Sequence, residues 1–86
     1  MAIKINAPYS LNSIVQEFYS GNENAIVMCS NLLNYMEAVI ALCKVVIDDK
    51  RLNDQSLRQE LESIELQATI TQKEAKAAMI QMSQIY

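Results

Sequence analysis

The stretch from Asn22 to Tyr86 contains neither glycine nor proline. These are the two residues that most readily end or break a helix, so their absence permits long uninterrupted helices. Within the same stretch, apolar residues recur at heptad spacing in two runs, which the short polar segment 48–54 separates. The pattern predicts two long helices joined by a short turn, and a short turn makes such helices antiparallel neighbours.

The first long helix is predicted over residues 22–49. Its heptad positions a and d are apolar throughout, with Ile26, Leu33, Ile40 and Ile47 at a, and Cys29, Met36 and Cys43 at d. A second apolar line runs beside them: Met28, Leu32, Tyr35, Val39, Leu42 and Val46. Together the two lines are wider than contact with one neighbouring helix requires. We therefore expect this helix to pack against at least two neighbours, from the same chain or from another.

The second long helix is predicted over residues 54–85. Either Asn53 or Asp54 can serve as its N-cap, and Ser56 with Gln59 fits a capping box. Its heptad positions carry large residues at the ends and small ones in the middle: Leu57, Leu61, Ile64, Ala68, Thr71, Ala75, Ala78, Met82 and Ile85. The small residues predict a close helix crossing. A secondary apolar line lies on a different face of this helix: Leu66, Ile70, Ala77 and Ile80.

The segment before Gly21 predicts a short helix over residues 10–20, with Ser10 as its N-cap. Its apolar face comprises Leu11, Ile14, Val15 and Phe18. Residues 1–8 end at a proline and are predicted to form an extended arm. The predicted fold is all-α and one domain, residues 1–86: an antiparallel two-helix hairpin (22–49 and 54–85) with a short N-terminal helix (10–20) and an extended N-terminal arm.

Charge and apolar runs limit the classes of partner. The chain of 86 residues has a net charge of −3, and its basic residues are scattered, so no nucleic-acid partner is expected. Its longest apolar run, 38–43, is far shorter than the roughly 20 residues of a membrane-spanning helix, so no transmembrane segment is expected. The N-terminus lacks the apolar region of a conventional signal peptide. The protein is therefore expected to be cytoplasmic when made, and export without such a peptide stays open.

The residue types that perform chemistry are missing or dispersed. Histidine is absent, and the single glycine, Gly21, cannot build a phosphate-binding loop. Cys29 and Cys43 lie about 21 Å apart on one predicted helix, so they cannot pair with each other or share a metal ion. They are predicted to be buried reduced thiols, with an intermolecular disulfide as the alternative. The sequence predicts no catalytic residue, no cofactor, no metal, no small-molecule substrate and no enzymatic activity.

The chain is 51% hydrophobic, which is more apolar surface than a two-helix hairpin can bury. This excess predicts contact with other proteins, either as a homo-oligomer or with a helical partner protein. The candidate interface residues lie off the main heptad lines or on the short first helix: Leu11, Phe18, Met28, Leu32, Tyr35, Val39, Leu42, Val46, Ala77, Met79 and Ile80.

Three segments resemble one known family. Residues 9–14 (Tyr-Ser-Leu-Asn-Ser-Ile), followed by Phe18 and Gly21, resemble the N-terminal signature of type III secretion needle subunits. Residues 53–57 resemble the start of the second helix in that family, and residues 73–81 are similar to its C-terminal segment. The proline-containing turn and the Tyr- and Asn-rich stretch of the family are missing.

This resemblance implies a non-enzymatic, self-assembling structural subunit of a bacterial protein secretion system. Leu11 and Phe18 are then expected to pack between subunits. Axial contacts in a helical filament are expected from four residues near the C-terminus: Ala77, Ala78, Ile80 and Gln81.

Three other functions stay open at this stage. One is a helical-hairpin cargo or targeting partner of a type VII, ESX-like secretion system, although the Trp-x-Gly turn of that family is absent. Another is a secretion chaperone whose wide apolar faces hold a cargo helix. The last is an unrelated helical adaptor, antitoxin-like or phage-encoded, that acts through heterodimerisation.

Overall fold

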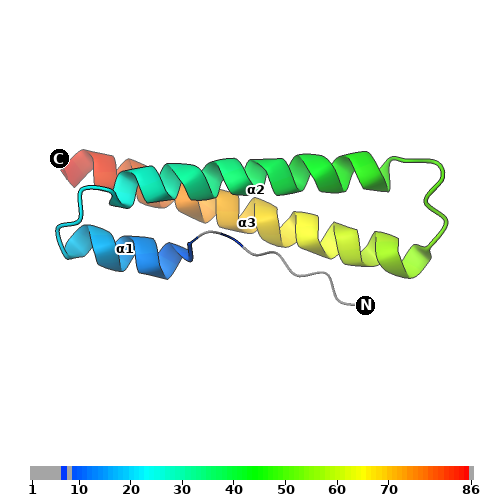
Figure 1. Ribbon diagram of the computed structural model, residues 1–86, viewed down its shortest axis with the longest axis horizontal. Helices are drawn as coiled ribbons and strands as arrows, with labels where there is room; N and C mark the ends of the chain where they lie inside the picture. Colours follow the sequence, from blue (N-terminus) through cyan, green and yellow to red (C-terminus); the bar gives the residue numbers. More distant parts are fainter. Residues whose placement is uncertain (1–6, 8, 86) are drawn as a thin grey trace.

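The computed structural model describes residues 7 and 9–85, and the secondary structure of this part of the chain consists of helices joined by turns (Figure 1). Helix α1 spans Leu11–Tyr19, α2 spans Ala25–Ile47 and α3 spans Gln55–Ile85. No strand occurs among the described residues. The predicted all-α class is therefore confirmed. The arm predicted over residues 1–8 lies outside the described residues, apart from Ala7.

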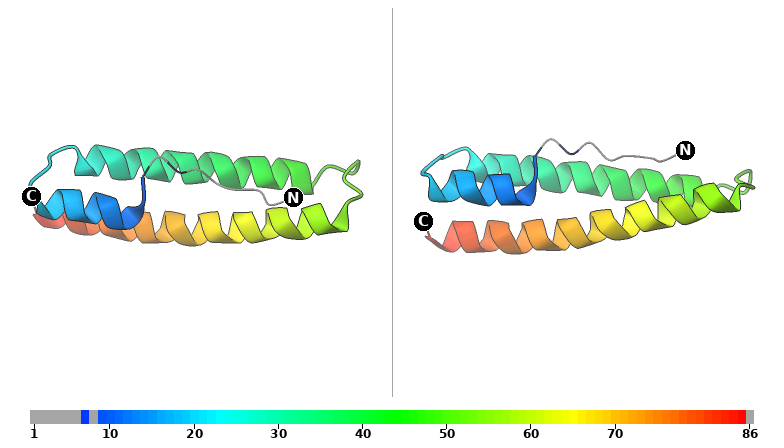
Figure 2. Two further views of the ribbon diagram at one scale, coloured as in Figure 1. Left: turned by 60° about the horizontal axis from the view of Figure 1, so that its bottom comes forward. Right: turned by 90° about the horizontal axis from the view of Figure 1, so that it is seen from below.

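The two long helices run side by side in opposite directions, and α1 lies against one end of the pair (Figures 1 and 2). Each of the three helices contacts the other two. α1 has 9 residues against 23 in α2 and 31 in α3, so it covers only part of their length. It lies beside the beginning of α2 and the end of α3 (Figure 2). We call this region the covered half, and the region toward the α2–α3 turn the uncovered half.

Local hydrogen bonds define both ends of α1. The Ser10 hydroxyl accepts a hydrogen bond from the backbone N–H of Ser13 at 3.2 Å, which confirms the predicted N-cap. The helix ends where Gly21 adopts a φ of +89°. This left-handed conformation strains residues with a side chain but not glycine. The predicted end of this helix before Gly21 is confirmed.

The α2 helix begins at Ala25, three residues after the predicted start at 22. The side chain of Asn22 accepts a hydrogen bond from the backbone N–H of Asn24 at 2.9 Å. Such a local bond stabilises a turn in competition with the helix. At its other end α2 stops at Ile47, where Arg58 of α3 donates hydrogen bonds to the carbonyls of Ile47 (2.6 Å) and Leu52 (3.2 Å). Arg58 thereby ties the connecting turn to α3.

Asp54 is the N-cap of α3, because its carboxylate accepts a hydrogen bond from the backbone N–H of Leu57 at 3.1 Å. This confirms one of the two predicted caps. The capping box predicted from Ser56 and Gln59 is wrong, since Ser56 already lies inside the first turn of α3. The bond to Asp54 satisfies a backbone donor that the first helical turn leaves without a partner.

The core is concentrated in the covered half and draws on all three helices. Its buried members form one contiguous cluster: Ile14, Phe18, Ala25, Cys29, Leu32, Met36, Ala68, Ala75 and Met82. Ala68 and Ala75 provide the close crossing that the sequence predicts. The Cys29 thiol of α2 donates a hydrogen bond to the Ala75 carbonyl of α3 at 3.3 Å, a contact that a larger residue at position 75 would obstruct.

The buried line of α2 includes the three predicted position-d residues, Cys29, Met36 and Cys43, but not the position-a residues. The position-a residues Ile26, Leu33 and Ile40 are only half-buried. The buried residues form a line rotated toward the predicted second line: Ala25, Cys29, Leu32, Met36 and Cys43. The reason is that α2 packs against two helices at once, so its most buried line faces the space between α1 and α3 rather than α3 alone.

Candidate protein-interaction surface

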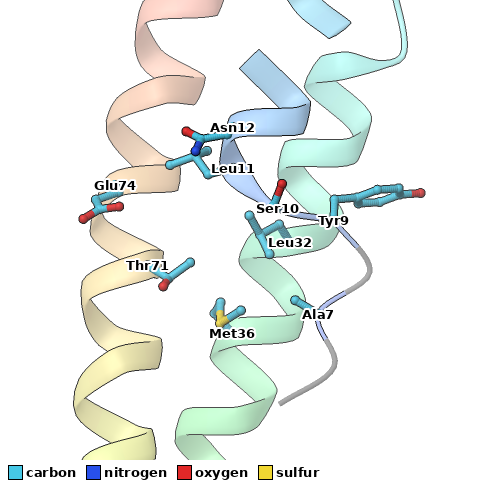
Figure 3. A pocket seen from close by; sticks show the side chains of 9 residues that line it. All are labelled: Ala7, Tyr9, Ser10, Leu11, Asn12, Leu32, Met36, Thr71 and Glu74. Carbon is cyan, nitrogen blue, oxygen red and sulfur yellow. The ribbon is translucent and has the colours of Figure 1, made fainter. Parts of the chain in front are cut away.

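A hollow lies where α1 begins, between α2 and α3 (Figure 3). Its volume is about 350 Å³. The lining comes from all three helices and the residues before α1: Ala7, Tyr9, Ser10, Leu11, Asn12, Leu32, Met36, Thr71 and Glu74. The Tyr9 ring points away from α3, so it leaves the hollow open (Figure 3). The hollow lies at the N-terminal end of α1, where α1 ceases to cover α2 and α3.

Polar groups lie at the rim of this hollow, and the buried residues of its lining are apolar. Ser10, Asn12 and Glu74 are exposed, whereas Leu32 and Met36 are buried. Within the described part of the chain, no buried side-chain nitrogen or oxygen lacks a hydrogen-bond partner. The same residues contain no group of three or more Cys, Asp or Glu placed to hold a metal ion. The hollow can therefore offer apolar contact but no buried polar group aimed at a ligand.

Both thiols are buried and reduced. Burial raises the pKa of Cys29 above its ordinary value of 9.0. Burial also raises the pKa of Cys43, and the nearby Glu65 carboxylate adds to that rise. A raised pKa keeps a thiol protonated and poorly nucleophilic at neutral pH. The two cysteines therefore behave as small core residues.

The exposed side of α2 opposite its buried line is uncharged and mostly apolar, with Asn31 and Asn34 as its polar members. We define the α2 outer face by its exposed uncharged residues: Val27, Asn31, Asn34, Ala38, Ala41, Leu42, Val45 and Val46. Leu42 is 67% exposed and Val45 is 69% exposed. An exposed cluster of large aliphatic residues such as Leu42, Val45 and Val46 is typical of an interaction site.

The two charged residues of α2, Glu37 and Lys44, lie outside this face. With 3.6 residues per turn, both fall on the edge of α2 that also carries Ile26 and Leu33, not on the side of Leu42. A protein partner can therefore cover the α2 outer face without removing any charge from water. That avoids the desolvation penalty of burying an ion.

A second exposed apolar surface lies on α3. We define the α3 outer stripe as Leu66, Ile70, Lys73, Ala77 and Ile80, all of them exposed. Leu66 is 60% exposed and Ile80 is 59% exposed. Lys73 is the single charged member of the stripe. The protein thus presents apolar surface on both of its long helices.

The structure divides the predicted interface residues into three groups. Phe18 and Leu32 lie in the core of the chain itself, so they are not available to a partner in this conformation. A second group is half-buried and packs against that core: Leu11, Met28, Tyr35, Val39 and Met79. The third group is exposed and lies on the two surfaces defined above: Leu42, Val46, Ala77 and Ile80.

The prediction missed several of the most exposed apolar residues. Val27 and Val45 on α2 are two of them, and Leu66 and Ile70 on α3 are two more. Leu66 and Ile70 belong to the predicted secondary line of α3 but were not chosen as interface residues. Val27 and Val45 lie half a turn away from the buried line. A search for apolar residues opposite the most regular heptad line could have found them.

Helix α2 is also long and apolar enough, by length and composition, to cross a membrane. It has 23 residues with a mean hydropathy of 1.6, and 22% of the apolar window is buried inside the protein. This is weak support, because a core helix of a soluble protein can pass the same test. Glu37 lies next to the middle of α2, where a charged side chain in a bilayer is most costly.

Comparison of the chain with protein families, with curated proteins and with solved structures found no match. The similarity to needle subunits therefore rests on the three sequence segments described above.

Proposed function

We propose that this protein is a non-enzymatic subunit that assembles with further copies of itself by burying the α2 outer face. The observation that carries the proposal is the exposure of Leu42 (67%) and Val45 (69%) on a face without charged residues. Removing a large aliphatic side chain from water stabilises an assembly by about 1.5–3 kcal/mol. Covering this face can therefore provide a substantial driving force.

The small core supports the same proposal. Three of its buried members, Ala25, Ala68 and Ala75, are alanines, which bury little apolar area. A small domain buries a smaller fraction of its surface on folding than a large one does, so its core provides only marginal stability. Association stabilises the folded state by mass action, because only the folded chain presents the α2 outer face. Self-assembly would thus offset the marginal stability of a single copy.

The assembling unit in this proposal is the antiparallel hairpin of α2 and α3, with α1 packed at one end and the N-terminal arm preceding it. The similarity of residues 9–14, 53–57 and 73–81 to needle subunits supports placing the assembly in a bacterial protein secretion system. In that setting the chain is made in the cytoplasm and functions as a structural protein, without cofactor or nucleic acid.

Light scattering on a size-exclusion column tests the proposal, with the protein applied from micromolar to millimolar concentration. The mass of the wild type is expected to rise with concentration. Leu42→Asp should lower it toward one chain, because the assembly would have to bury a carboxylate without a partner. Gln16→Asp is the matched control, since it adds the same charge at an exposed position of α1.

A constant mass of one chain at every concentration would overturn self-assembly. A wild type that dissolves only when co-expressed with another protein would also overturn it, and would favour the heterodimeric adaptor or chaperone. A mass that grows without limit sends the sample to electron microscopy, where filaments are expected.

A further inference from the structure

We infer that assembly is head-to-tail: the α2 outer face of one copy packs against the α3 outer stripe of the next copy. This inference rests on the proposed function and names the partner of its contact surface. The occupant of the α2 outer face is therefore a second copy of this chain, and the contacting element of that copy is α3.

The two surfaces point to opposite sides of the helix pair. The buried residues of α2 and α3 face each other, as the contact between Cys29 and Ala75 shows. The α2 outer face and the α3 outer stripe each lie about half a turn from those buried residues. A copy docked on one surface thus leaves the other surface open for a further copy.

The spacing of the two surfaces matches. Along α2, the outer residues 27, 31, 34, 38, 41 and 45 follow alternate steps of four and three. Along α3, residues 66, 70, 73, 77 and 80 follow the same steps. This is the period at which two helices pack along a shared seam. The stripe is about 21 Å long and the α2 face about 27 Å, so the stripe fits within the face.

Side-chain size also matches. Near its middle, the α2 outer face carries Asn34 and the small residues Ala38 and Ala41. The α3 outer stripe carries larger ones, Leu66, Ile70 and Ile80, which are exposed. Large side chains of one helix pack into the spaces beside small side chains of another. A contact between two α2 faces would bring small residues together and leave the α3 stripe uncovered.

Charge disfavours the remaining arrangement, in which two α3 stripes pack on each other. Lys73 is the middle member of the stripe, so a two-fold symmetric contact would place it against Lys73 of the second copy. Like charges so close together are destabilising. On the uncharged α2 outer face, the apolar stem of Lys73 can pack while its ammonium group reaches the rim. In the head-to-tail arrangement, each copy between two neighbours has its α2 outer face covered by one neighbour and its α3 outer stripe covered by the other.

A mixing experiment tests this inference by light scattering. Leu42→Asp blocks the α2 outer face, and Ile80→Asp blocks the α3 outer stripe. Each variant alone is expected to have the mass of one chain at a concentration where the wild type assembles. An equimolar mixture is expected to form a dimer of fixed mass, because it retains one intact α2 face and one intact α3 stripe.

Circular dichroism establishes that each variant keeps the helical content of the wild type, and Gln16→Asp serves as the charge control. If Ile80→Asp loses its helical structure, Leu66→Asp replaces it at the other end of the stripe. Wild-type-like assembly of the stripe variant, or a mixture that stays at the mass of one chain, would overturn the inference. In both cases the wild type still assembles, so the proposed function would stand. A wild type that never assembles would overturn both.

Discussion

Leu32 and Leu42 belong to the same helix, yet Leu32 is 1% exposed and Leu42 is 67% exposed. Leu32 lies in the covered half, where α1 joins α2 and α3, and Leu42 lies in the uncovered half, where the described residues provide no third helix. The two residues have equal intrinsic hydrophobicity. Leu32 belongs to the buried line of α2, whereas Leu42 lies on the α2 outer face. The difference shows that the side of α2 on which a residue lies, not its hydrophobicity, decides whether a single copy buries it.

The two halves are also held together differently. The covered half has a contiguous cluster of buried side chains from three helices. In the uncovered half, α2 contributes Cys43 as a buried residue, and Arg58 bonds to two carbonyls at the turn. The covered half thus depends on packing, whereas the far end of the uncovered half depends on a few polar contacts.

The largest expected effect tests this difference with one substitution in each half. Leu32→Ala should lower the free energy of unfolding by about 2–5 kcal/mol, because it leaves a cavity in the core. Leu42→Ala should change the stability of a single copy by no more than about 0.5 kcal/mol. Urea unfolding, followed by circular dichroism at a concentration where the protein is a single chain, measures both values.

Equal losses from the two leucine substitutions would show that the uncovered half is packed as well as the covered half, and would contradict the comparison. Leu33→Ala gives an intermediate reference point. Leu33 is half-buried at a position where the heptad predicted core, so its loss should fall between those of the two leucines.

The next effect concerns the turn that closes the uncovered half. Arg58→Met keeps a long apolar stem but removes the bonds to the carbonyls of Ile47 and Leu52. Hydrogen bonds from a charged donor typically contribute about 1.5–3 kcal/mol, and a loss near the lower end is expected at this partly buried site. The urea midpoint measures the loss, and hydrogen exchange at the end of α2 should show faster opening.

Arg51→Met is the matched control for the turn. Arg51 forms an ion pair with Asp49 at 2.8 Å, but its side chain is 91% exposed. Exposed ion pairs contribute little to stability, so this substitution should have the smaller effect. If Arg51→Met destabilised the protein more than Arg58→Met, the role assigned to Arg58 would be wrong.

The smallest expected effect is a loss of folding stability at alkaline pH, to which the two buried thiols contribute separately. Burial raises the pKa of Cys29 above 9.0, so the folded state holds this proton more tightly than the unfolded state does. The stabilisation is fully present below about pH 9 and is lost as pH rises through the raised folded-state pKa. Stability should therefore fall at alkaline pH.

Urea midpoints at about pH 7 and about pH 10 measure this loss in the wild type and in Cys29→Ala. The variant should lose less stability between the two values, since it lacks the titrating thiol. Cys43→Ala is the companion variant, because the raised pKa of Cys43 also reflects the nearby Glu65 carboxylate. The same alkaline loss in the wild type and in both variants would show that other groups cause it.

The helices themselves were largely predictable. Ser10 and Asp54 are capping residues, and Gly21 adopts the positive φ that a helix end commonly requires. These signals act within a few residues of one another, so they can be read without knowledge of the rest of the chain. The start of α2 was placed at 22 instead of 25 because the Asn22 side chain forms a local turn that competes with the helix.

The candidate surface was only partly predictable. Among the predicted interface residues, Leu42, Val46, Ala77 and Ile80 are exposed in a single copy, and their contact with a partner stays a prediction. Leu32 and Phe18 were chosen for the same surface but lie in the core. Periodicity shows which residues share a face of a helix, but it does not show which of two apolar faces another helix of the same chain will cover.

By itself, the sequence determined that the described chain is helical, where each helix begins and ends to within about three residues, and that α2 is apolar on more than one side. These properties follow from capping, from the absence of glycine and proline, and from the spacing of apolar residues. Only the tertiary structure decided that Leu32 is buried while Leu42 and Val45 face solvent. The physical reason is that α1 and α3 cover one side of α2 and leave its outer face exposed, and burial depends on which surfaces meet.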